Sequence, residues 1–197
     1  METISISFID AQQYLALQDQ IVDVYRQAFA DAPYYRTEAD VIGFAQFIPR
    51  HVQRADFRAA VALSLPENRV VGMAYGYRSG PGQWWYDVVS QALGPSRTAE
   101  WLADAFQLVE LAVHPDAQGR RLGSRLHDSL LTGLPHRRAV LSTMQAETVA
   151  YRLYLRRGWV SLIEPFTFPG VSRPYRIMGL RLPFKPPPSH DLPASPG

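Results

Sequence analysis

The feature that most constrains the fold of this 197-residue chain is the stretch LVELAVHPDAQGRRLGSRLHDSLL, residues 108–131. Apolar residues dominate 108–113, which predicts a strand, and leucines recur every four residues from 122 to 130, which predicts a helix. A second apolar run follows at 139–143. Parallel strands joined through a helix need a right-handed crossover. The stretch therefore predicts a strand–helix–strand unit and places the chain in the α/β class.

The other segments predict one mixed sheet around this unit. Alternating apolar residues predict strands at 4–8, 57–65, 70–77, 159–163 and 175–182. Helical spacing predicts helices at 17–28, at 37–48 behind a Thr37–Asp40 capping pair, and at 148–157 before Gly158. Residues 79–98, with several Gly and Pro, predict an irregular excursion that contains at most a short helix.

Composition excludes several classes of function. The chain has no cysteine, which rules out disulfides, thiolate nucleophiles and cysteine-based zinc sites, and no histidines are paired at helical i, i+4 spacing, so we expect no metal. The net charge is only +2, and the near-absence of lysine beside many arginines is typical of codon bias in a GC-rich genome. A nucleic-acid binder would need its arginines gathered on one face, so we expect no nucleic acid. No signal peptide or apolar run of membrane-spanning length is visible, so we expect a cytoplasmic protein with no membrane contact.

The C-terminal segment differs from the rest of the chain. Residues 183–197 contain six prolines and no apolar periodicity. We therefore expect a single domain over 1–182 and a Pro-rich disordered tail over 183–197, which can be removed after Leu182 without loss of stability.

The loop before the predicted helix at 122–130 has the chemistry of a phosphate site. Unpaired N–H groups at a helix N-terminus attract phosphate oxygens, and glycines let the backbone approach them. The loop is neither a Walker A sequence nor a dinucleotide fingerprint. An arginine-rich, solvated helix face remains the alternative. The candidate phosphate-binding residues are Gln118, Gly119, Arg120, Arg121, Leu122, Gly123 and Ser124.

Two motifs resemble those of the GNAT superfamily of N-acetyltransferases. The first resembles the family's [QR]-x-x-G-x-[GA], with Gln118 and Gly123 at its ends. Arg121 stands where the family usually has a glycine, so we expect ordinary helical angles there. The second, residues 147–160, resembles N-x-x-A-x-x-L-Y-x-x-x-G-[FW], with Glu147 in place of the asparagine. Its matching positions are Ala150, Leu153, Tyr154, Gly158 and Trp159.

This resemblance implies a GNAT fold, a single mixed and mostly antiparallel sheet of about 6–7 strands flanked by helices. Its central β-α-β unit would bind acetyl-CoA as cosubstrate. The strands at 108–113 and 139–143 would splay apart, with the pantetheine arm in the gap and loop 118–124 around the pyrophosphate. The Val113 N–H would stabilise the oxyanion. The resemblance also assigns Leu111, Ala112, Val113, Ala150 and Arg157 to the cofactor.

The reaction that the resemblance implies includes two proton transfers: the acceptor ammonium loses a proton, and the CoA thiolate gains one. Tyr154 matches the family's general acid, although it could instead only pack against the cofactor. Glu110 is the best candidate base, because a carboxylate in an apolar strand needs water or a cation beside it. A solvated strand face or a salt bridge to an arginine are the alternatives, and His114 is a weaker candidate. Alternation predicts Leu108, Glu110 and Ala112 on one face and Val109, Leu111 and Val113 on the other.

The expected function is acetyl transfer to a primary amine of a small molecule or peptide by direct attack. The alternative is a catalytically degenerate acyl-CoA-binding sensor. The acceptor is the expected partner, and a homodimer is left open. Aromatic residues that could wall the acceptor site are Tyr34, Tyr35, Phe44, Phe47, Trp84, Trp85, Phe166 and Phe168.

Overall fold

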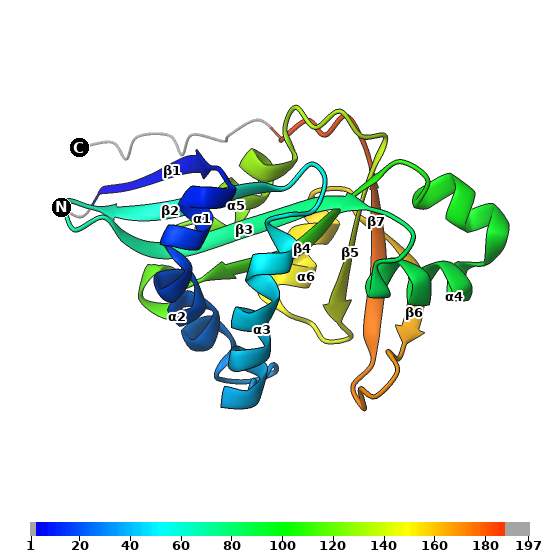
Figure 1. Ribbon diagram of the computed structural model, residues 1–197, viewed down its shortest axis with the longest axis horizontal. Helices are drawn as coiled ribbons and strands as arrows, with labels where there is room; N and C mark the ends of the chain where they lie inside the picture. The colour runs from blue at the N-terminus through cyan, green and yellow to red at the C-terminus, as the bar shows by residue number, and fades with distance from the viewer. Residues whose placement is uncertain (1–2, 188–197) are drawn as a thin grey trace, which may run out of the picture.

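The computed structural model describes residues 3–187, which form one seven-stranded sheet with helices on both faces (Figure 1). The strand order is β1-β2-β3-β4-β5-β7-β6, and only β4 and β5 are parallel. The predicted mixed, mostly antiparallel sheet is therefore confirmed. The strands are β1 (Thr3–Ile9), β2 (Arg58–Leu65), β3 (Arg69–Ser79), β4 (Ala105–Val113), β5 (Arg138–Met144), β6 (Val160–Phe166) and β7 (Tyr175–Arg181).

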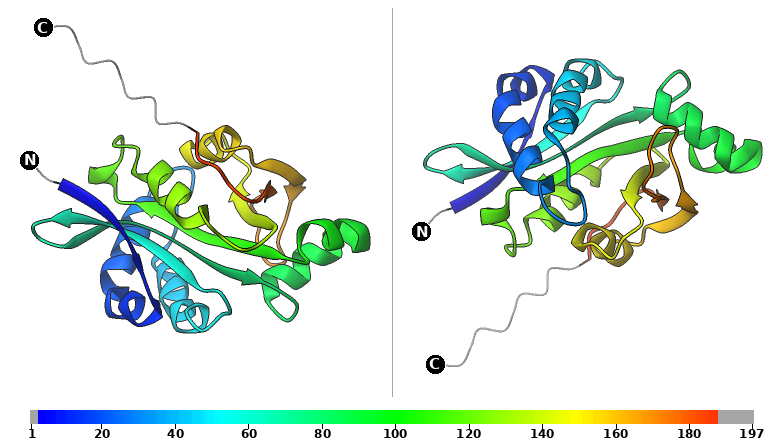
Figure 2. Two further views of the ribbon diagram at one scale, coloured as in Figure 1. Left: turned by 90° about the horizontal axis from the view of Figure 1, so that it is seen from above. Right: turned by 90° about the horizontal axis from the view of Figure 1, so that it is seen from below.

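The helices divide between the two faces of the sheet (Figure 2). The helices α1 (Ala11–Ala16), α2 (Gln18–Phe29) and α3 (Glu38–His51) pack over β2, β3 and β4 on one face. The helices α5 (Leu122–Leu131) and α6 (Val149–Arg156) bury their apolar sides against the other face. A 3₁₀ turn, η1 (Pro115–Ala117), connects β4 towards α5. Strands β4 and β5 lie at the centre of this sheet, between the two groups of helices.

Helix α3 begins where the capping pair predicts. The Asp40 N–H donates to Oγ1 of Thr37 at 3.3 Å, and the Thr37 N–H donates to Oδ2 of Asp40 at 2.8 Å. This reciprocal cap satisfies N–H groups that a helix start otherwise leaves unpaired. The loop between α2 and α3 is thereby held at a fixed place beside β4.

The prediction of an irregular excursion at 79–98 was wrong. The segment contains α4 (Trp84–Trp101), an 18-residue helix that covers the β5–β7 end of the sheet. Gly94 takes the non-helical angles φ 75° and ψ 169°, which kink the helix, and Pro95 then begins the second half. Trp85, Val89 and Leu93 are buried at spacing i, i+4, i+8, so the helical signal was present but hidden by the turn residues.

A β-bulge in β4 overturns the predicted alternation of side chains. Tyr75 of β3 lies opposite Glu110, whereas Gly76 lies opposite Leu108, which leaves Val109 as an extra residue. Leu108 therefore packs on the α5 face together with Leu111 and Val113, and Val109 packs with Ala112 on the α1–α3 face. Glu110 shares the α1–α3 face with Tyr75, because residues directly opposite in a sheet point the same way.

Strands β4 and β5 separate soon after they meet. Their pairing covers only Ala105–Gln107 against Arg138–Val140. Beyond these residues β4 continues to pair with β3 and β5 with β7, so the two strands diverge in the middle of the sheet. The predicted splaying of this pair is confirmed.

The predicted domain boundary at Leu182 was misplaced. Phe184 is buried, with 7% of its surface exposed, and belongs to the core cluster on the α5 face. The proline-rich composition concealed this apolar anchor. The rest of the predicted tail, from 188 on, lies outside the described residues. Among residues 3–187, no helix combines the length and apolar character needed to cross a membrane.

Candidate active site

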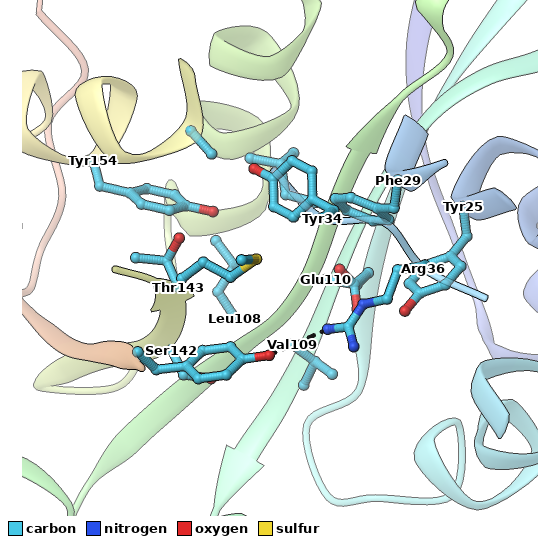
Figure 3. Close-up of a pocket in the computed structure, with 14 residues that line it drawn as sticks. Tyr25, Phe29, Tyr34, Arg36, Leu108, Val109, Glu110, Ser142, Thr143 and Tyr154 are labelled. Atoms are coloured by element: carbon cyan, nitrogen blue, oxygen red, sulfur yellow. Dashed lines mark hydrogen bonds between the residues drawn. The ribbon is translucent and has the colours of Figure 1, made fainter. Parts of the chain in front are cut away.

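A cavity of about 80 Å³ opens where β4 and β5 diverge (Figure 3). Its walls come from helix α2, the loop after it, the bulged part of β4, the end of β5, helix α6 and the start of β7. The lining residues are Tyr25, Phe29, Tyr34, Arg36, Leu108, Val109, Glu110, Leu111, Ser142, Thr143, Met144, Ala150, Tyr154 and Tyr175. The cavity thus brings together Glu110 and Tyr154, the two residues that the sequence predicts as base and acid.

Glu110 is a partly buried carboxyl group whose pKa is raised to about 7. Removal from water is the main cause, because burial disfavours the charged form, and the nearby Arg36 opposes the shift. The pairing of Glu110 with Tyr75 puts the carboxyl on the face that α2 and its following loop cover. A carboxyl with this pKa can accept a proton and release it near neutral pH.

Tyr154 enters the cavity from α6. The helix starts at Thr148, whose hydroxyl accepts the Tyr151 N–H at 2.9 Å, and it ends before Gly158, which has φ 82°. The Tyr154 side chain is buried, and its pKa is raised by burial first and by Tyr34 and Glu110 in addition. The phenol therefore keeps its proton at neutral pH, as a general acid must.

A buried polar chain joins α5 to the residues that follow α6. The Trp159 indole N–H donates to Nε2 of His127 at 2.9 Å, so the other ring nitrogen of His127 carries the proton. That Nδ1 lies 2.8 Å from Oδ1 of Asp128. Arg157 donates to both oxygens of Asp128, at 2.9 and 2.8 Å. This chain joins α5 to the end of α6 and so fixes the helix that carries Tyr154.

The predicted phosphate loop leads into the first turn of α5. The helix has no side-chain cap, so its first N–H groups face outward towards the loop. Gly119 takes a positive φ of 77°. A Cβ added at Gly123 would meet only Cγ2 of Val113, at 3.9 Å. The Gln118 side chain donates to the Val113 carbonyl at 3.1 Å and so ties the loop to the end of β4.

The expectation of helical angles at Arg121 was wrong. Arg121 has φ 58° and ψ 18°, in the left-handed region that favours glycine. This is the position where the related family usually has a glycine. Arg121 thus holds a backbone conformation that a glycine would adopt more easily, at a cost of about 1 kcal/mol or more in local strain.

Several predicted site residues have other partners in the structure. Arg157 is engaged with Asp128, and its role towards the cofactor stays a prediction. Nδ1 of His114 accepts the Asp116 N–H at 3.3 Å, and His114 does not line the cavity. Glu147 is exposed and forms an ion pair with Arg176 at 3.5 Å. The buried side chains of Ala112 and Leu122 belong to the core on opposite faces of the sheet.

The aromatic residues proposed as acceptor walls divide into three groups. Tyr34 lines the cavity. The buried core residues among them are Phe44, Trp85, Phe166 and Phe168, and the exposed ones outside the lining are Tyr35, Phe47 and Trp84. Sequence reasoning missed Tyr25, Phe29, Arg36 and Tyr175. Tyr25 and Phe29 are four residues apart on α2, a spacing that could have suggested one shared face.

Between residues 3 and 187, no group of three or more His, Cys, Asp or Glu side chains is placed to hold an ion.

Comparisons with known proteins agree with this geometry. A GCN5-like protein acetyltransferase of Mycobacterium tuberculosis is 37% identical over 132 residues, which are 62% of this chain and 63% of the relative, so the match spans less than two thirds of that protein. A GNAT acetyltransferase of Staphylococcus aureus superposes with a TM-score of 0.64 at 12% identity, covering 91% of this chain and 99% of the other.

The PaiA N-acetyltransferase of Thermoplasma acidophilum, solved with coenzyme A, superposes with a TM-score of 0.53 at 12% identity, over 91% of this chain and 99% of the other. Identities this low show a common fold. The model of the acetyltransferase (GNAT) family matches residues 14–159, which include β4, the loop before α5 and Tyr154. The chain therefore belongs to the GNAT family of acetyltransferases.

Proposed function

We propose that this protein is an N-acetyltransferase that moves an acetyl group from acetyl-CoA to a primary amine of a small molecule or peptide by direct attack. The observation that carries the proposal is that Glu110 and Tyr154 line one cavity at the point where β4 and β5 separate. A proton acceptor with a pKa near 7 and a protonated phenol are the two groups that can assist the two proton transfers in the aminolysis of a thioester.

The separated strands and the α5 N-terminus fit acetyl-CoA, which supplies the thioester carbonyl and the thiolate leaving group. The unpaired backbone edge of β4 beyond Gln107, with Leu111 and Val113 on it, can pair with the pantetheine arm. The uncapped first turn of α5 and the open space at Gly123 suit a pyrophosphate. The residues of the cradle would be Gln118, Gly119, Arg120, Arg121, Leu122, Gly123 and Ser124, with Ala150 beside the thioester end.

Each proton has a place in this scheme. Glu110 takes one proton from the acceptor ammonium, and the amine nitrogen then bonds to the thioester carbon. The Val113 N–H stabilises the oxyanion that forms. As the C–S bond breaks, Tyr154 gives its proton to the thiolate and regains one from the nitrogen. Glu110 finally releases its proton to water, so one proton leaves for each acetyl group transferred.

The test is the release of CoA thiol across a panel of primary amines, with acetyl-CoA binding measured separately by calorimetry. Turnover on at least one amine, lost in Glu110→Gln and in Tyr154→Phe, supports the proposal. Acetyl-CoA binding without turnover on any amine would instead identify a sensor, and absence of acetyl-CoA binding would remove both readings.

A further inference from the structure

Arg36 occupies a position in the cavity that the acetyl-transfer scheme does not use. It follows α2 and directly precedes Thr37, the N-cap of α3, and its side chain lines the cavity. In the view of Figure 3 the Arg36 guanidinium lies beside the Glu110 carboxyl, on the side away from Tyr154. The acceptor end of the cavity therefore holds a carboxyl group and a cation next to each other.

The guanidinium of Arg36 has only weak partners within residues 3–187. Nη2 donates to the Tyr175 hydroxyl at 3.4 Å, and Nη1 lies 3.7 Å from Oδ1 of Asp40. The other Asp40 oxygen is engaged in the cap of α3, where it accepts the N–H and the hydroxyl of Thr37. A guanidinium offers five N–H donors in a planar fork that matches a carboxylate. The side chain is 35% exposed, so its N–H groups can still donate hydrogen bonds to a ligand in the cavity.

The remaining walls at this end are largely aromatic. Tyr25 and Phe29 of α2 lie with their rings 4.9 Å apart in an edge-on arrangement, and Phe29 meets the Tyr34 ring at 4.8 Å. All three residues line the cavity, which is small. Its acceptor end is thus complementary to a small molecule with one cationic, one anionic and one apolar part.

We infer that the acceptor is a free amino carboxylate with an apolar side group, whose carboxylate pairs with Arg36 while its ammonium faces Glu110. This inference rests on the proposed N-acetyltransferase function and names its substrate class. The positive Arg36 thus faces the negative end of the amino acid, and the negative Glu110 faces its positive end. This orientation places the amine nearer to Tyr154 and to the thioester. Arg36 is then a specificity-determining residue, and Glu110 remains the base.

The rival role for Arg36 is to act only through Glu110, as a fixed positive charge beside it. That role predicts an equal loss for every amine when Arg36 is replaced, with a shifted pH profile. Carboxylate recognition predicts a loss confined to acceptors that carry a carboxylate. The two roles therefore separate in a comparison of matched acceptors.

The experiment compares free L-amino acids that have apolar side chains, such as L-phenylalanine, with the amide and the decarboxylated amine of each. The readout is kcat/KM from CoA thiol release. We expect a preference of about 10- to 100-fold for the free acid, the range for hydrogen bonds to a charged group. The amide has the more weakly basic amine and loses its proton more easily, so amine ionisation cannot produce this preference over the amide.

Variants assign the preference to a residue. Arg36→Gln should equalise the three acceptors, and Arg36→Lys should restore part of the preference, because it keeps the charge without the fork. Arg26→Gln is the matched control, since Arg26 on α2 pairs with Glu38 at 3.1 Å outside the cavity. It removes the same charge from the same region and should leave the preference intact. The inference is overturned if the wild type has equal kcat/KM for the acid and the amide, or if Arg36→Gln loses activity equally on all acceptors. It is also overturned if a lysine-containing peptide is acetylated faster than every free amino acid.

Binding provides a readout that does not require turnover. Calorimetry with CoA present should show tighter binding of the free amino acid than of its amide, and this difference should vanish in Arg36→Gln. If the difference is found without turnover, substrate recognition by Arg36 stands and the proposed acetyl transfer fails. If turnover occurs without any such difference, acetyl transfer stands and the inference fails.

Discussion

The ring of Phe184 lies edge-on against the ring of His127, with the two centroids 5.3 Å apart. His127 is fully buried and belongs to the polar chain that joins α5 to α6. The chain that follows β7 is thus anchored beside the helix that carries Tyr154.

A chain that ends at Leu182 should lose stability. Removal of the buried Phe184 side chain leaves a cavity next to His127, and we expect the free energy of unfolding to fall by about 3 kcal/mol. Phe184→Ala in the full chain should give a similar value in urea denaturation. A chain that ends at Lys185 keeps the anchor and should match the full-length protein. Equal stability of all three would show that the contact contributes nothing.

Glu110→Gln should lower kcat/KM most at low pH, and raising the pH should partly rescue it, because more of the amine is then already deprotonated. In the wild type, kcat/KM should rise with an apparent pKa of about 7, the value that burial gives the Glu110 carboxyl. The variant should lose this inflection. A wild-type pH profile in Glu110→Gln would end the assignment of the base.

The same substitution should stabilise the protein at alkaline pH. The unfolded carboxyl loses its proton near its ordinary value of 4.5, and the folded one only near 7, so the folded state binds more protons between these values. The free energy of unfolding therefore falls as the pH rises from 4.5 to 7 and stays low above. The neutral Gln side chain avoids this loss, and we expect a gain of about 1–3 kcal/mol at pH 8. If Glu110 instead formed a salt bridge essential to the fold, Glu110→Gln would lower the free energy of unfolding at pH 8.

Tyr154→Phe should leave acetyl-CoA affinity nearly unchanged and reduce turnover by about 10²- to 10⁴-fold, the range for a lost general acid. Tyr151→Phe is the control, because it removes a hydroxyl from the same helix at a residue outside the cavity lining. Calorimetry and initial rates measure the two effects. A rate within a few-fold of the wild type would reduce Tyr154 to a packing role.

Gly123→Glu should abolish acetyl-CoA binding without unfolding the chain. The position has room for a side chain, with only Val113 Cγ2 near an added Cβ, so the fold tolerates the change while a carboxylate repels the pyrophosphate. Gly123→Ala should bind within a few-fold of the wild type. Gly43→Glu, on α3 and with open space around it, controls for the added charge. Unchanged affinity in Gly123→Glu would move the phosphate site elsewhere.

The sequence anticipated what local patterns encode. Apolar periodicity located every strand and the helices that carry strong amphipathic stripes, and the capping pair located the start of α3. The second motif selected Tyr154, and the position of a lone carboxylate in an apolar strand selected Glu110; the fold brings both residues to one cavity. These signals depend on neighbours along the chain, which a sequence displays directly.

Features that depend on a partner strand or on distant packing were not visible. The extra residue Val109 is defined by its register against β3, and alternation alone cannot locate it. The left-handed angles of Arg121 are imposed by the loop around it, against the preference of its side chain. Arg36 reaches the cavity because α2 packs on β3 and β4, a contact between segments far apart in the chain.

The bulge at Val109 has a consequence for the entropy of catalysis. Groups displayed on loops must be ordered when a ligand binds, and that ordering weakens binding. Glu110 instead projects from a strand that hydrogen-bonded neighbours hold on both sides of the bulge. Its backbone freedom is already lost when the protein folds, so the carboxyl can meet the amine with little further ordering. The ladder that continues on both sides of the bulge thus makes the rigid sheet a preorganised support for a reactive group.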